Sequence, residues 1–469
     1  MSFDKLHEEC AVYGVSLNVD EAAGITYNGL LALQHRGQES AGIAVYDTDR
    51  LVCRKNLGLV SEAITNDMLT DLAHSKSAIG HCLYSGKGNS HECDVQPFIT
   101  EYLTGRIATA HNGNLVNGKS IKKRLVKLGV RFTSNSDSEI ISALVAYNTV
   151  ITGSLEEGVA KAMNELIGAF SVVILSGDNS VVAFRDPWGY RPLCIGENKH
   201  GVAVASESCG LDSQGFNFIR DIAPGEMVII KDGQIVTEKV VLTKEKRGLC
   251  IFEYVYFART DSFIEGMSVF KSRFNMGKIL AEECPADADI VCGVPDSGLE
   301  AAQGYAAQSG LPLVPAFVKN RYIGRSFIYP TQSQRETAVK IKLNPLRVNV
   351  EGKRIVLVDD SIVRGTTSAN IISALKSAGA KEVHMRISSP PFKHNCYFGT
   401  DVDNEENLAA NRMTIEGICE SIGAESLGYL SIDGLKKACD ECRLPFCTGC
   451  FDGEYFIDDE LLREYREGK

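Results

Sequence analysis

The sequence predicts a two-domain protein in which an α+β domain is followed by an α/β domain. The chain has 469 residues, which exceeds the size of one ordinary core. In the first half, short strands are bounded by turns such as Asp232-Gly233, a typical hairpin turn. In the second half, apolar strands alternate with amphipathic helices. This alternation is typical of a mainly parallel sheet with right-handed crossovers.

The composition indicates a globular protein and excludes several functional classes. Hydrophobic residues make up 44% of the chain and charged residues 23%, and the net charge of -11 argues against nucleic acid as a partner. No apolar run approaches the roughly 20 residues that cross a membrane. Residues 1–9 are acidic and lack an apolar core, so they do not form a secretory signal. Fifteen cysteines without such a signal indicate a reducing, cytoplasmic location.

The C-terminal half is organised around residues 355–368, IVLVDDSIVRGTTS. Residues 355–358 predict a buried strand, and Asp359 and Asp360 follow it directly. A small-residue turn at 365–368 then starts an amphipathic helix, whose N-terminus suits a phosphate. Two carboxylates at the carboxyl end of a strand suit sugar hydroxyls and Mg²⁺. An ordinary crossover with solvated acidic residues is the alternative for a pattern of this kind.

The full string is similar to the signature of the type I phosphoribosyltransferases, which bind 5-phosphoribosyl-1-pyrophosphate (PRPP). The resemblance implies that the two aspartates contact the ribose hydroxyls and that the Gly-Thr-Thr loop holds the 5-phosphate. The implied PRPP-binding residues of this stretch are Asp359, Asp360, Ser361, Arg364, Gly365, Thr366 and Thr367. The implied Mg²⁺ contacts are Ser297, Asp359 and Asp360.

A basic segment at residues 319–336 offers cations for the pyrophosphate. Its cationic residues are Lys319, Arg321, Arg325 and Arg335, with Gly324 as a flexible point. A solvated basic loop is the ordinary alternative. In the phosphoribosyltransferase resemblance, this loop closes over PRPP and excludes water. Closure matters because water would otherwise hydrolyse the developing oxocarbenium ion.

The N-terminal half begins with Cys10 at the start of an expected strand, a position where a buried packing cysteine is the ordinary interpretation. Three polar, glycine-containing segments follow, at residues 34–47, 110–117 and 134–140. With Cys10, and in this order, they resemble the class II glutamine amidotransferase domain. The resemblance implies an αββα fold of the N-terminal-nucleophile (Ntn) hydrolase type. Amide hydrolysis by such a domain needs a nucleophile, a base and an oxyanion hole.

The resemblance assigns these roles to particular residues. Cys10 becomes the first residue of the mature chain, and its own α-amino group, with a pKa of about 7.7–8.0, acts as the base. Residues 1–9 would then be a leader that is removed by cleavage between Glu9 and Cys10. The other implied roles are the oxyanion hole for Asn112 and Gly113, glutamine binding for Asp137, and the framework near the nucleophile for Arg36.

One segment departs from the amidotransferase pattern. Residues 80–86 read GHCLYSG where the family has G-H-V-R-Y-[SA]-T, so Leu83 replaces the arginine that clamps the glutamine α-carboxylate. An Arg–carboxylate contact contributes about 1.5–3 kcal/mol. Its loss predicts roughly 10- to 100-fold weaker use of glutamine, unless another cation such as Lys87 substitutes.

Two C-x-x-C pairs lie close together near the C-terminus, Cys439/Cys442 and Cys447/Cys450. Their spacing is compatible with a zinc site, an iron–sulfur cluster or unrelated packing cysteines. Some amidotransferases with this domain combination carry a structural [4Fe–4S] cluster. The resemblance to them implies Cys250, Cys396, Cys447 and Cys450 as its ligands, and Cys439 and Cys442 then remain unused.

Together, the two halves are similar to the amidophosphoribosyltransferase family. This resemblance implies that ammonia, released from glutamine at Cys10, crosses an internal channel and displaces pyrophosphate at C1 of Mg-bound PRPP. The product would be 5-phosphoribosylamine, in the first committed step of de novo purine (IMP) biosynthesis. Feedback inhibition by purine nucleotides and a homotetramer are implied as well. The implied division is a leader at 1–9, an amidotransferase domain at 10–245, a phosphoribosyltransferase domain at 246–425 and a helical tail with the cluster cysteines at 426–469.

Two alternatives come from other functional classes. An amidotransferase acting on sugar phosphates would share the first half, but it should have isomerase domains where this chain has VLVDDSIVRGTTS. The other is an ammonia-dependent or regulatory paralogue with impaired glutaminase activity. Leu83 supports that paralogue, whereas the presence of Cys10, Asn112, Gly113 and Asp137 opposes it.

Overall fold

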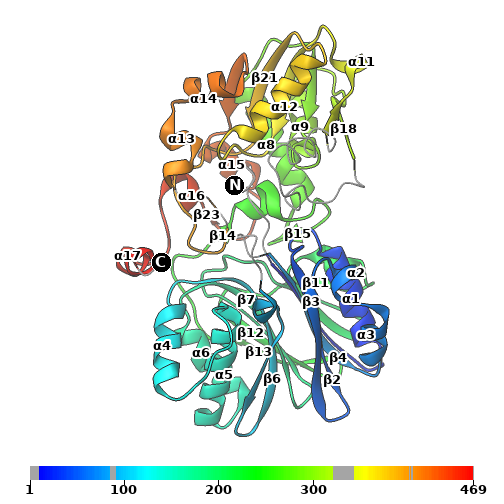
Figure 1. Cartoon of the computed structure of the whole chain (residues 1–469), viewed down its shortest axis with the longest axis vertical. Helices are drawn as coiled ribbons and strands as arrows, with labels where there is room; N and C mark the ends of the chain where they lie inside the picture. Colours follow the sequence, from blue (N-terminus) through cyan, green and yellow to red (C-terminus); the bar gives the residue numbers. More distant parts are fainter. Residues whose placement is uncertain (1–9, 85–90, 321–342, 401, 403–404, 468–469) are drawn as a thin grey trace.

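The computed structural model describes residues 10–84, 91–320, 343–400, 402 and 405–467. Several residues named above lie outside these ranges: the leader at 1–9, Lys87, Arg321, Gly324, Arg325 and Arg335. Figure 1 shows two lobes, with the N-terminal half in the lower one and most of the C-terminal half in the upper one.

Two antiparallel sheets form the centre of the N-terminal lobe. The first has seven strands in the order β11 (Asn217–Asp221), β9 (Cys194–Asn198), β10 (Gly201–Ala205), β1 (Ala11–Leu17), β4 (Ser77–Leu83), β2 (Ser40–Asp47) and β3 (Arg50–Leu57). The second has six, in the order β13 (Gln234–Val240), β12 (Glu226–Lys231), β8 (Val181–Arg185), β7 (Gly168–Ser176), β6 (Gly105–Leu115) and β5 (Phe98–Tyr102). The helices are α1 (Ala22–Ala32), α2 (Val60–Ala63), α3 (Asn66–Asp71), η1 (Glu92–Asp94), α4 (Gly118–Lys127), α5 (Asp137–Thr152), α6 (Leu155–Glu165) and α7 (Ser208–Asp212).

The alternation of side chains along β1 explains how these layers stack. Val12 packs between the sheets with Val173 of β7, whereas Tyr13 and Val15 pack against Leu30 of α1 on the outer face. Helices α5 and α6 cover the outer face of the second sheet in the same way. Figure 1 shows α1–α3 and α4–α6 on opposite sides of the two sheets. The predicted αββα fold is therefore confirmed.

A parallel four-stranded sheet forms the centre of the C-terminal lobe, as predicted. Its order is β17 (Ile290–Gly293), β20 (Arg354–Asp359), β21 (Glu382–Ile387) and β22 (Ser426–Tyr429). Val356 and Val358 face helices α8 (Val269–Glu283) and α9 (Leu299–Ser309). Ile355 and Leu357 face α12 (Thr366–Ser377) and α14 (Ile415–Ile422) on the other side.

Two details concern the edges of this sheet. The segment after α9 adds only a single bridge, Val291 to Leu313, because Pro312 and Pro315 have no N–H to donate to a ladder. Its strand β18 (Phe317–Lys319) pairs instead with β19 (Leu343–Pro345) outside the sheet. In addition, β22 belongs to the sheet, so the expected boundary at residue 425 falls directly before the last strand.

The remaining elements join the lobes and form the tail. They are β14 (Leu249–Cys250), a π-helical turn at Glu253–Phe257, β15 (Phe263–Ile264), β16 (Met267–Ser268), α11 (Arg347–Val350), η4 (Glu405–Asn407), α13 (Ala409–Arg412), α15 (Ile432–Ala438), β23 (Phe446–Cys447), α16 (Gly449–Asp452) and α17 (Asp459–Glu467). Strands β14 and β23 pair in parallel, so the tail returns to the start of the C-terminal lobe.

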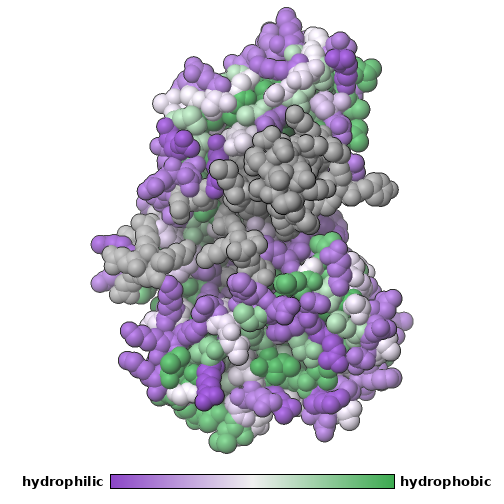
Figure 2. All heavy atoms as spheres, viewed as in Figure 1, coloured by the Kyte–Doolittle hydropathy of each residue, from purple (hydrophilic) through white to green (hydrophobic). Residues whose placement is uncertain are grey.

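Among the described residues, no helix has the length and apolar character to cross a membrane. On the face in Figure 2, hydrophilic side chains are widespread and apolar ones form separate patches.

Candidate functional site

Cys10 lies immediately before β1, beside the end of the neighbouring strand β4. The N–H of Tyr84 donates to the Cys10 Sγ over 3.5 Å, and the Sγ lies 3.5 Å from the carbonyl oxygen of the same residue. Burial raises the pKa of the Cys10 thiol to about 11, although Tyr84 and Arg36 favour its thiolate. A thiol with this pKa is a weak nucleophile near neutral pH, so it needs a base beside it.

Arg36 is fully buried and positions the backbone of Cys10. Its Nε donates to the Cys10 carbonyl over 3.2 Å. Its two terminal nitrogens form a bidentate pair with Glu253, at 2.8 and 2.9 Å, and one of them also donates to Glu207 over 2.6 Å. Burial alone would raise the pKa of Glu207, but His35 and Arg36 hold it well below its usual value. The charge of Arg36 is therefore paired with the charges of Glu207 and Glu253.

The two glutamates of this network were not among the predicted site residues. Glu253 belongs to the aromatic segment EYVYF, and Glu207 to the ASES sequence that follows β10. A lone carboxylate within an apolar run is a signal for a buried ion pair. The sequence does not indicate that both carboxylates converge on one arginine, because the three residues are more than 40 positions apart.

Asn112 and Gly113 lie side by side on β6. The side chain of Asn112 is 1% exposed, and neither its oxygen nor its nitrogen has a hydrogen-bond partner among the described residues. A buried amide without partners costs about 1–3 kcal/mol, which a bound ligand could recover. Gly113 has a φ of 137°, and a Cβ there would lie 2.0 Å from the Ala169 carbonyl oxygen, so only glycine fits.

Contacts across the sandwich link Asn112 to the strand beside Cys10. The ring Nε2 of His81, on β4, lies 3.0 Å from the carbonyl oxygen of His111, which precedes Asn112. Asp137 begins α5, and its Oδ2 accepts the N–H of Leu115 over 2.7 Å. Burial raises the pKa of Asp137 to about 6. The Asn112 amide therefore lies on β6, and the Asp137 carboxylate is bonded to the same strand from the start of α5.

Leu83 is the last residue of β4 and is 8% exposed. Its carbonyl accepts the N–H of Glu39 over 3.0 Å, and the next residue is Tyr84, which contacts the Cys10 thiol. The position next to the expected nucleophile is therefore occupied by a neutral, apolar side chain. Lys87, the possible substitute cation, lies outside the described residues.

The second candidate site lies at the carboxyl edge of the parallel sheet. Asp359 ends β20 and Asp360 follows it; both side chains are buried. The Ser297 hydroxyl lies 3.3 Å from Asp359 Oδ1, which also accepts the N–H of Asp360 over 3.0 Å. The Ser361 hydroxyl donates to Asp360. Two carboxylates and a hydroxyl are hard oxygen donors, and such a set fits Mg²⁺.

The start of α12 lies next to these carboxylates. Gly365 is its N-cap and has a φ of 91°, so the chain turns there in a conformation that other residues rarely adopt. Thr366 and Thr367 form the first turn of α12, and the N–H groups at the start of a helix point toward its N-terminus and suit a phosphate. Arg364 is half-buried beside this turn, and Lys319 forms an ion pair with Asp296.

The four expected cluster cysteines converge at the junction of the lobes. Cys250 and Cys447 lie opposite each other in the β14–β23 pair. Cys450 lies within electrostatic range of Cys250, Cys396 and Cys447. Burial raises the pKa of Cys250 and of Cys447 to about 12. A bound metal would therefore be needed to keep these thiols ionised.

The surroundings of these thiols suit a buried prosthetic group. The Tyr190 and Phe398 rings stack with centroids 4.0 Å apart, and the Phe398 N–H donates to the Cys396 Sγ over 3.4 Å. Within the described part of the chain, no three His, Cys, Asp or Glu side chains converge on a single-ion site. A cuboidal cluster holds its thiolates farther apart than a single ion does. The four thiols, of which Cys447 is buried and the other three are half-buried, suit the ligand set of an iron–sulfur cluster.

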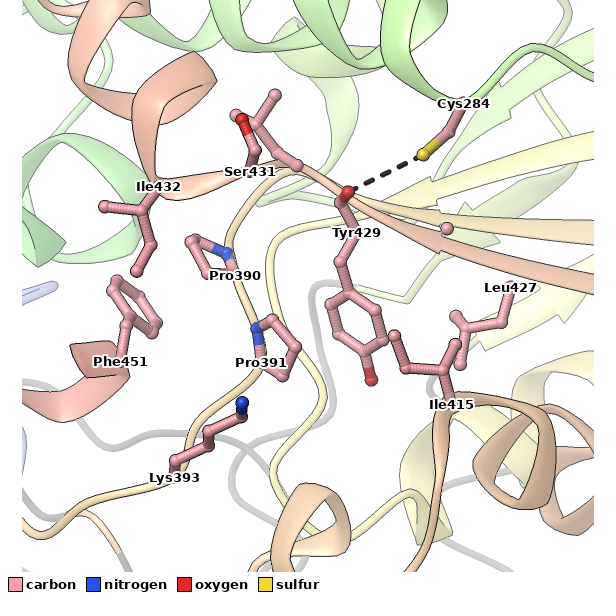
Figure 3. A pocket seen from close by; sticks show the side chains of 12 residues that line it. Cys284, Pro390, Pro391, Lys393, Ile415, Leu427, Tyr429, Ser431, Ile432 and Phe451 are labelled. Carbon is pink, nitrogen blue, oxygen red and sulfur yellow. Dashed lines mark hydrogen bonds between the residues drawn. The ribbon is translucent and has the colours of Figure 1, made fainter.

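A separate pocket of about 380 Å³ lies on the β22 side of the C-terminal lobe. Figure 3 shows Tyr429, Leu427 and Ile415 on one side of it and Ile432 and Phe451 on the other. None of the predicted site residues lines it. The pocket therefore has no part in the assignment of either site.

Comparison with known proteins places each half in a family. A family model for a glutamine amidotransferase domain matches residues 87–213, and one for a phosphoribosyl transferase domain matches residues 266–389. An amidophosphoribosyltransferase from Archaeoglobus fulgidus is 46% identical over 449 residues, which cover 95% of this chain and 97% of the relative. One from Bacillus subtilis is 43% identical over 470 residues, covering 98% of each chain.

Solved structures agree over nearly the same length. The chain matches a structure described as the allosteric regulatory enzyme of purine biosynthesis with a TM-score of 0.89 and 41% identity, covering 96% of both chains. It also matches the glutamine PRPP amidotransferase from B. subtilis complexed with ADP and GMP, with a TM-score of 0.88 and 41% identity. That match covers 96% of this chain and 98% of the other.

Proposed function

Because the chain belongs to the amidophosphoribosyltransferase family, we propose that its N-terminal lobe releases ammonia from glutamine at Cys10 and its C-terminal lobe transfers this ammonia to PRPP. The chain catalyses the first step of purine biosynthesis. The observation that carries this conclusion is the presence of both domains in one chain, in an order shared with relatives over nearly their whole length.

For the glutaminase half, the Cys10 thiol attacks the amide carbon of glutamine, forms a thioester and releases ammonia; water then hydrolyses the thioester. Removal of residues 1–9 would provide the α-amino group of Cys10 as the base. The Asn112 amide has no hydrogen-bond partner among the residues that the structure describes, which supports its role in the oxyanion hole with the Gly113 N–H. The proposed glutamine-binding residues are Asp137, which holds the α-amino group, and Arg36, which positions the backbone of Cys10.

For the transferase half, ammonia attacks C1 of PRPP and pyrophosphate leaves with the bonding electrons. Asp359 and Asp360 hold the ribose hydroxyls, and the turn of Ser361, Arg364, Gly365, Thr366 and Thr367 holds the 5-phosphate. Ser297, Asp359 and Asp360 would bind Mg²⁺, which neutralises charge on the pyrophosphate when present. Lys319, Arg321 and Arg325 are proposed to contact PRPP from the basic segment.

We also propose a structural [4Fe–4S] cluster on Cys250, Cys396, Cys447 and Cys450. Its support is the convergence of four cysteines from segments far apart in the sequence. The cluster would cross-link the tail to the transferase lobe, which supplies Cys250 and Cys396. We further propose the domain division given above, with β22 added to the transferase domain.

Regulation and assembly are proposed from the family. The B. subtilis relative complexed with ADP and GMP supports purine nucleotides as inhibitors of this chain. A homotetramer and a cytoplasmic location are proposed as well. The location is supported by the fifteen cysteines, all within the described residues, since none of them forms a disulfide.

A second candidate is an ammonia-dependent paralogue with impaired glutaminase activity. Leu83 favours it, since no positive charge stands at that position to hold the glutamine α-carboxylate. This candidate shares the transferase half, and the two differ only in the nitrogen donor.

The deciding experiment measures pyrophosphate release from Mg-PRPP with glutamine, and in parallel with ammonium at raised pH. Activity with both donors supports the two-site enzyme and shows that Leu83 is compensated. Activity with ammonium alone supports the paralogue. Activity with neither donor, from protein with an intact cluster and a trimmed N-terminus, argues against both and favours a regulatory role.

A further inference from the structure

Two cysteines of the tail remain outside both active sites and outside the proposed cluster. Cys439 is the C-cap of α15, and Cys442 follows it in a turn. The N–H of Cys442 donates to the Cys439 carbonyl over 3.1 Å. Such a bond closes a four-residue turn, whose first and last Cα atoms lie within about 7 Å of each other. Disulfides join Cα atoms about 4.4–6.8 Å apart, so the turn brings this pair close to bonding range.

The two thiols differ in exposure. Cys439 is fully buried in the core of the C-terminal lobe, whereas Cys442 is half-buried and next to the exposed Glu441. Exchange with a small disulfide needs one thiol that the reagent can reach. It also needs a second, shielded thiol that releases the half of the reagent bound to the first thiol. Cys442, the less buried of the two, meets the first requirement and Cys439 the second; because burial raises the pKa of both thiols, the exchange should be faster at raised pH.

The surroundings of Cys442 fix the turn in place. The N–H of Arg443 donates to the Glu265 carbonyl over 2.9 Å, which attaches the turn to the β15–β16 hairpin. The hydroxyl of Tyr254 lies beside Cys442 and donates to the Ile264 carbonyl over 2.6 Å. Among the described residues, no third His, Cys, Asp or Glu completes a metal site with the pair. Two thiols alone do not make a structural zinc site, which takes four protein ligands.

We propose that Cys439 and Cys442 form a reversible dithiol–disulfide site that reacts with low-molecular-weight disulfides. The Cys442 thiolate attacks one sulfur of the reagent, forms a mixed disulfide and releases the first thiolate. The Cys439 thiolate then attacks the Cys442 sulfur, forms the Cys439–Cys442 bond and releases the second thiolate. The two protons lost by the cysteines go to the released thiolates. The pair is thus oxidised by two electrons and the reagent is reduced to two thiols.

The sequence allows this reaction to be observed apart from the cluster. Trypsin cleaves after Lys437 and after Arg443, so both cysteines fall in one short peptide, ACDECR, that contains no other cysteine. Full-length protein is treated with oxidised glutathione under anaerobic conditions, quenched with N-ethylmaleimide and digested. The proposal expects this peptide to be unalkylated and two hydrogens lighter than its reduced form, and dithiothreitol to reverse the change. Iron content of the same samples shows whether the cluster has been lost.

Three variants test the order of attack. In C439S the mixed disulfide should accumulate on Cys442, because the displacing thiol is missing. In C442S the buried Cys439 should not react. C419S is the control, since Cys419 is also half-buried but has no cysteine within three positions, and it should behave as the wild type. The proposal is overturned if the wild-type peptide carries two N-ethylmaleimide groups after the treatment, or if its mixed disulfide does not convert to the Cys439–Cys442 disulfide. It is also overturned if Cys439 reacts with oxidised glutathione equally well in C442S.

Discussion

Arg36 and Glu253 form a bidentate ion pair, at 2.8 and 2.9 Å, that joins the segment beside the nucleophile to the beginning of the C-terminal lobe. Both side chains are fully buried. Because the same guanidinium donates to the Cys10 carbonyl, the position of the nucleophile depends on a carboxylate from the other half of the chain. The arrangement suits an enzyme whose two reactions must occur in the same molecule.

Replacing Glu253 should uncouple the two half-reactions. In Glu253→Gln, Arg36 loses the charge of Glu253, and a misplaced Cys10 should lower glutamine-dependent activity by on the order of 10²-fold. Ammonium-dependent activity should be retained, because no hydrogen bond joins this pair to the described residues of the proposed PRPP site. Loss of a buried charge partner should also lower the free energy of unfolding by about 3–5 kcal/mol, measured by urea titration.

The matched control for Glu253→Gln is Asp261→Asn. Asp261 pairs with Arg259 at 2.6 Å, but its side chain is 60% exposed. An exposed pair contributes less than about 1 kcal/mol, so this variant should keep both activities and nearly all its stability. Equal losses of both activities in Glu253→Gln would show that the pair serves folding alone.

Asn112 should contribute to catalysis and not to stability. Asn112→Ala should lower kcat with glutamine by about 10²–10³-fold, the usual effect of removing one oxyanion-hole donor. Its free energy of unfolding should be unchanged or higher, because neither polar atom of the buried amide has a hydrogen-bond partner in the described part of the chain. Steady-state kinetics and urea unfolding of the same preparation measure the two effects.

Asn114 offers a control on the same strand. Its amide nitrogen donates to the Tyr397 carbonyl over 2.8 Å and to the Tyr465 hydroxyl over 3.1 Å. Asn114→Ala should therefore lose stability while keeping most of its glutaminase rate. If instead Asn112→Ala is strongly destabilised and still active, the amide of Asn112 has a structural role.

Asp137 should make stability depend on pH. Its pKa is about 6 in the folded protein and about 3.9 in an unfolded chain, because burial disfavours the charged carboxylate. Between pH 4 and 6 the unfolded chain loses this proton while the folded protein keeps it, so stability falls as pH rises. The loss is complete above pH 6 and reaches up to about 3 kcal/mol.

Asp137→Asn isolates this effect. The variant should match the wild type in free energy of unfolding below pH 4 and exceed it above pH 6. Its glutamine-dependent activity should be low at every pH, since a neutral amide does not pair with the α-amino group. If the difference in free energy of unfolding between Asp137→Asn and the wild type does not change from pH 4 to 6, Asp137 ionises normally.

The fold was predictable where a local sequence pattern determines the secondary structure. It was less predictable where prolines or contacts between distant residues determine it. Val356 and Val358 alternate with Ile355 and Leu357, and this short apolar run is enough to indicate a strand buried on both faces. Strand β22 was missed because it is short and contains Gly428, whose absent Cβ gives room to Cys284. Glycine weakens a strand signal even where tertiary packing requires it.

The candidate site was predictable where its residues are neighbours in sequence. Asp359, Asp360 and Gly365 lie within one strand-to-helix connection, whose geometry follows from the chain order. Tertiary contacts place Cys250 opposite Cys447 in the β14–β23 strand pair. They also bring Glu207 and Glu253 to Arg36. Spacing along the chain carries no information on such contacts.

The four junction cysteines should hold iron and sulfide. Cys396→Ser should lower the iron and sulfide content of anaerobically purified protein, because a serine oxygen is a poor ligand for a cluster of this type. Limited proteolysis should then cut the tail faster, since its link to the transferase lobe is weakened. Cys419→Ser is the control and should keep both. Stoichiometric zinc without sulfide in the wild type would overturn the cluster assignment.

Leu83→Arg tests whether the missing carboxylate clamp limits glutamine use. The side chain ends β4 beside Tyr84, so an arginine there would place a cation next to the nucleophile. We expect the KM for glutamine to fall roughly 10- to 100-fold, the effect of one charge-assisted contact of about 1.5–3 kcal/mol. The rate with ammonium should not change, because ammonium has no carboxylate to bind. Leu83→Met, which keeps the volume and adds no charge, should leave both parameters near wild type. An unchanged KM in Leu83→Arg, from protein with normal ammonium activity, would mean that another cation already holds the carboxylate.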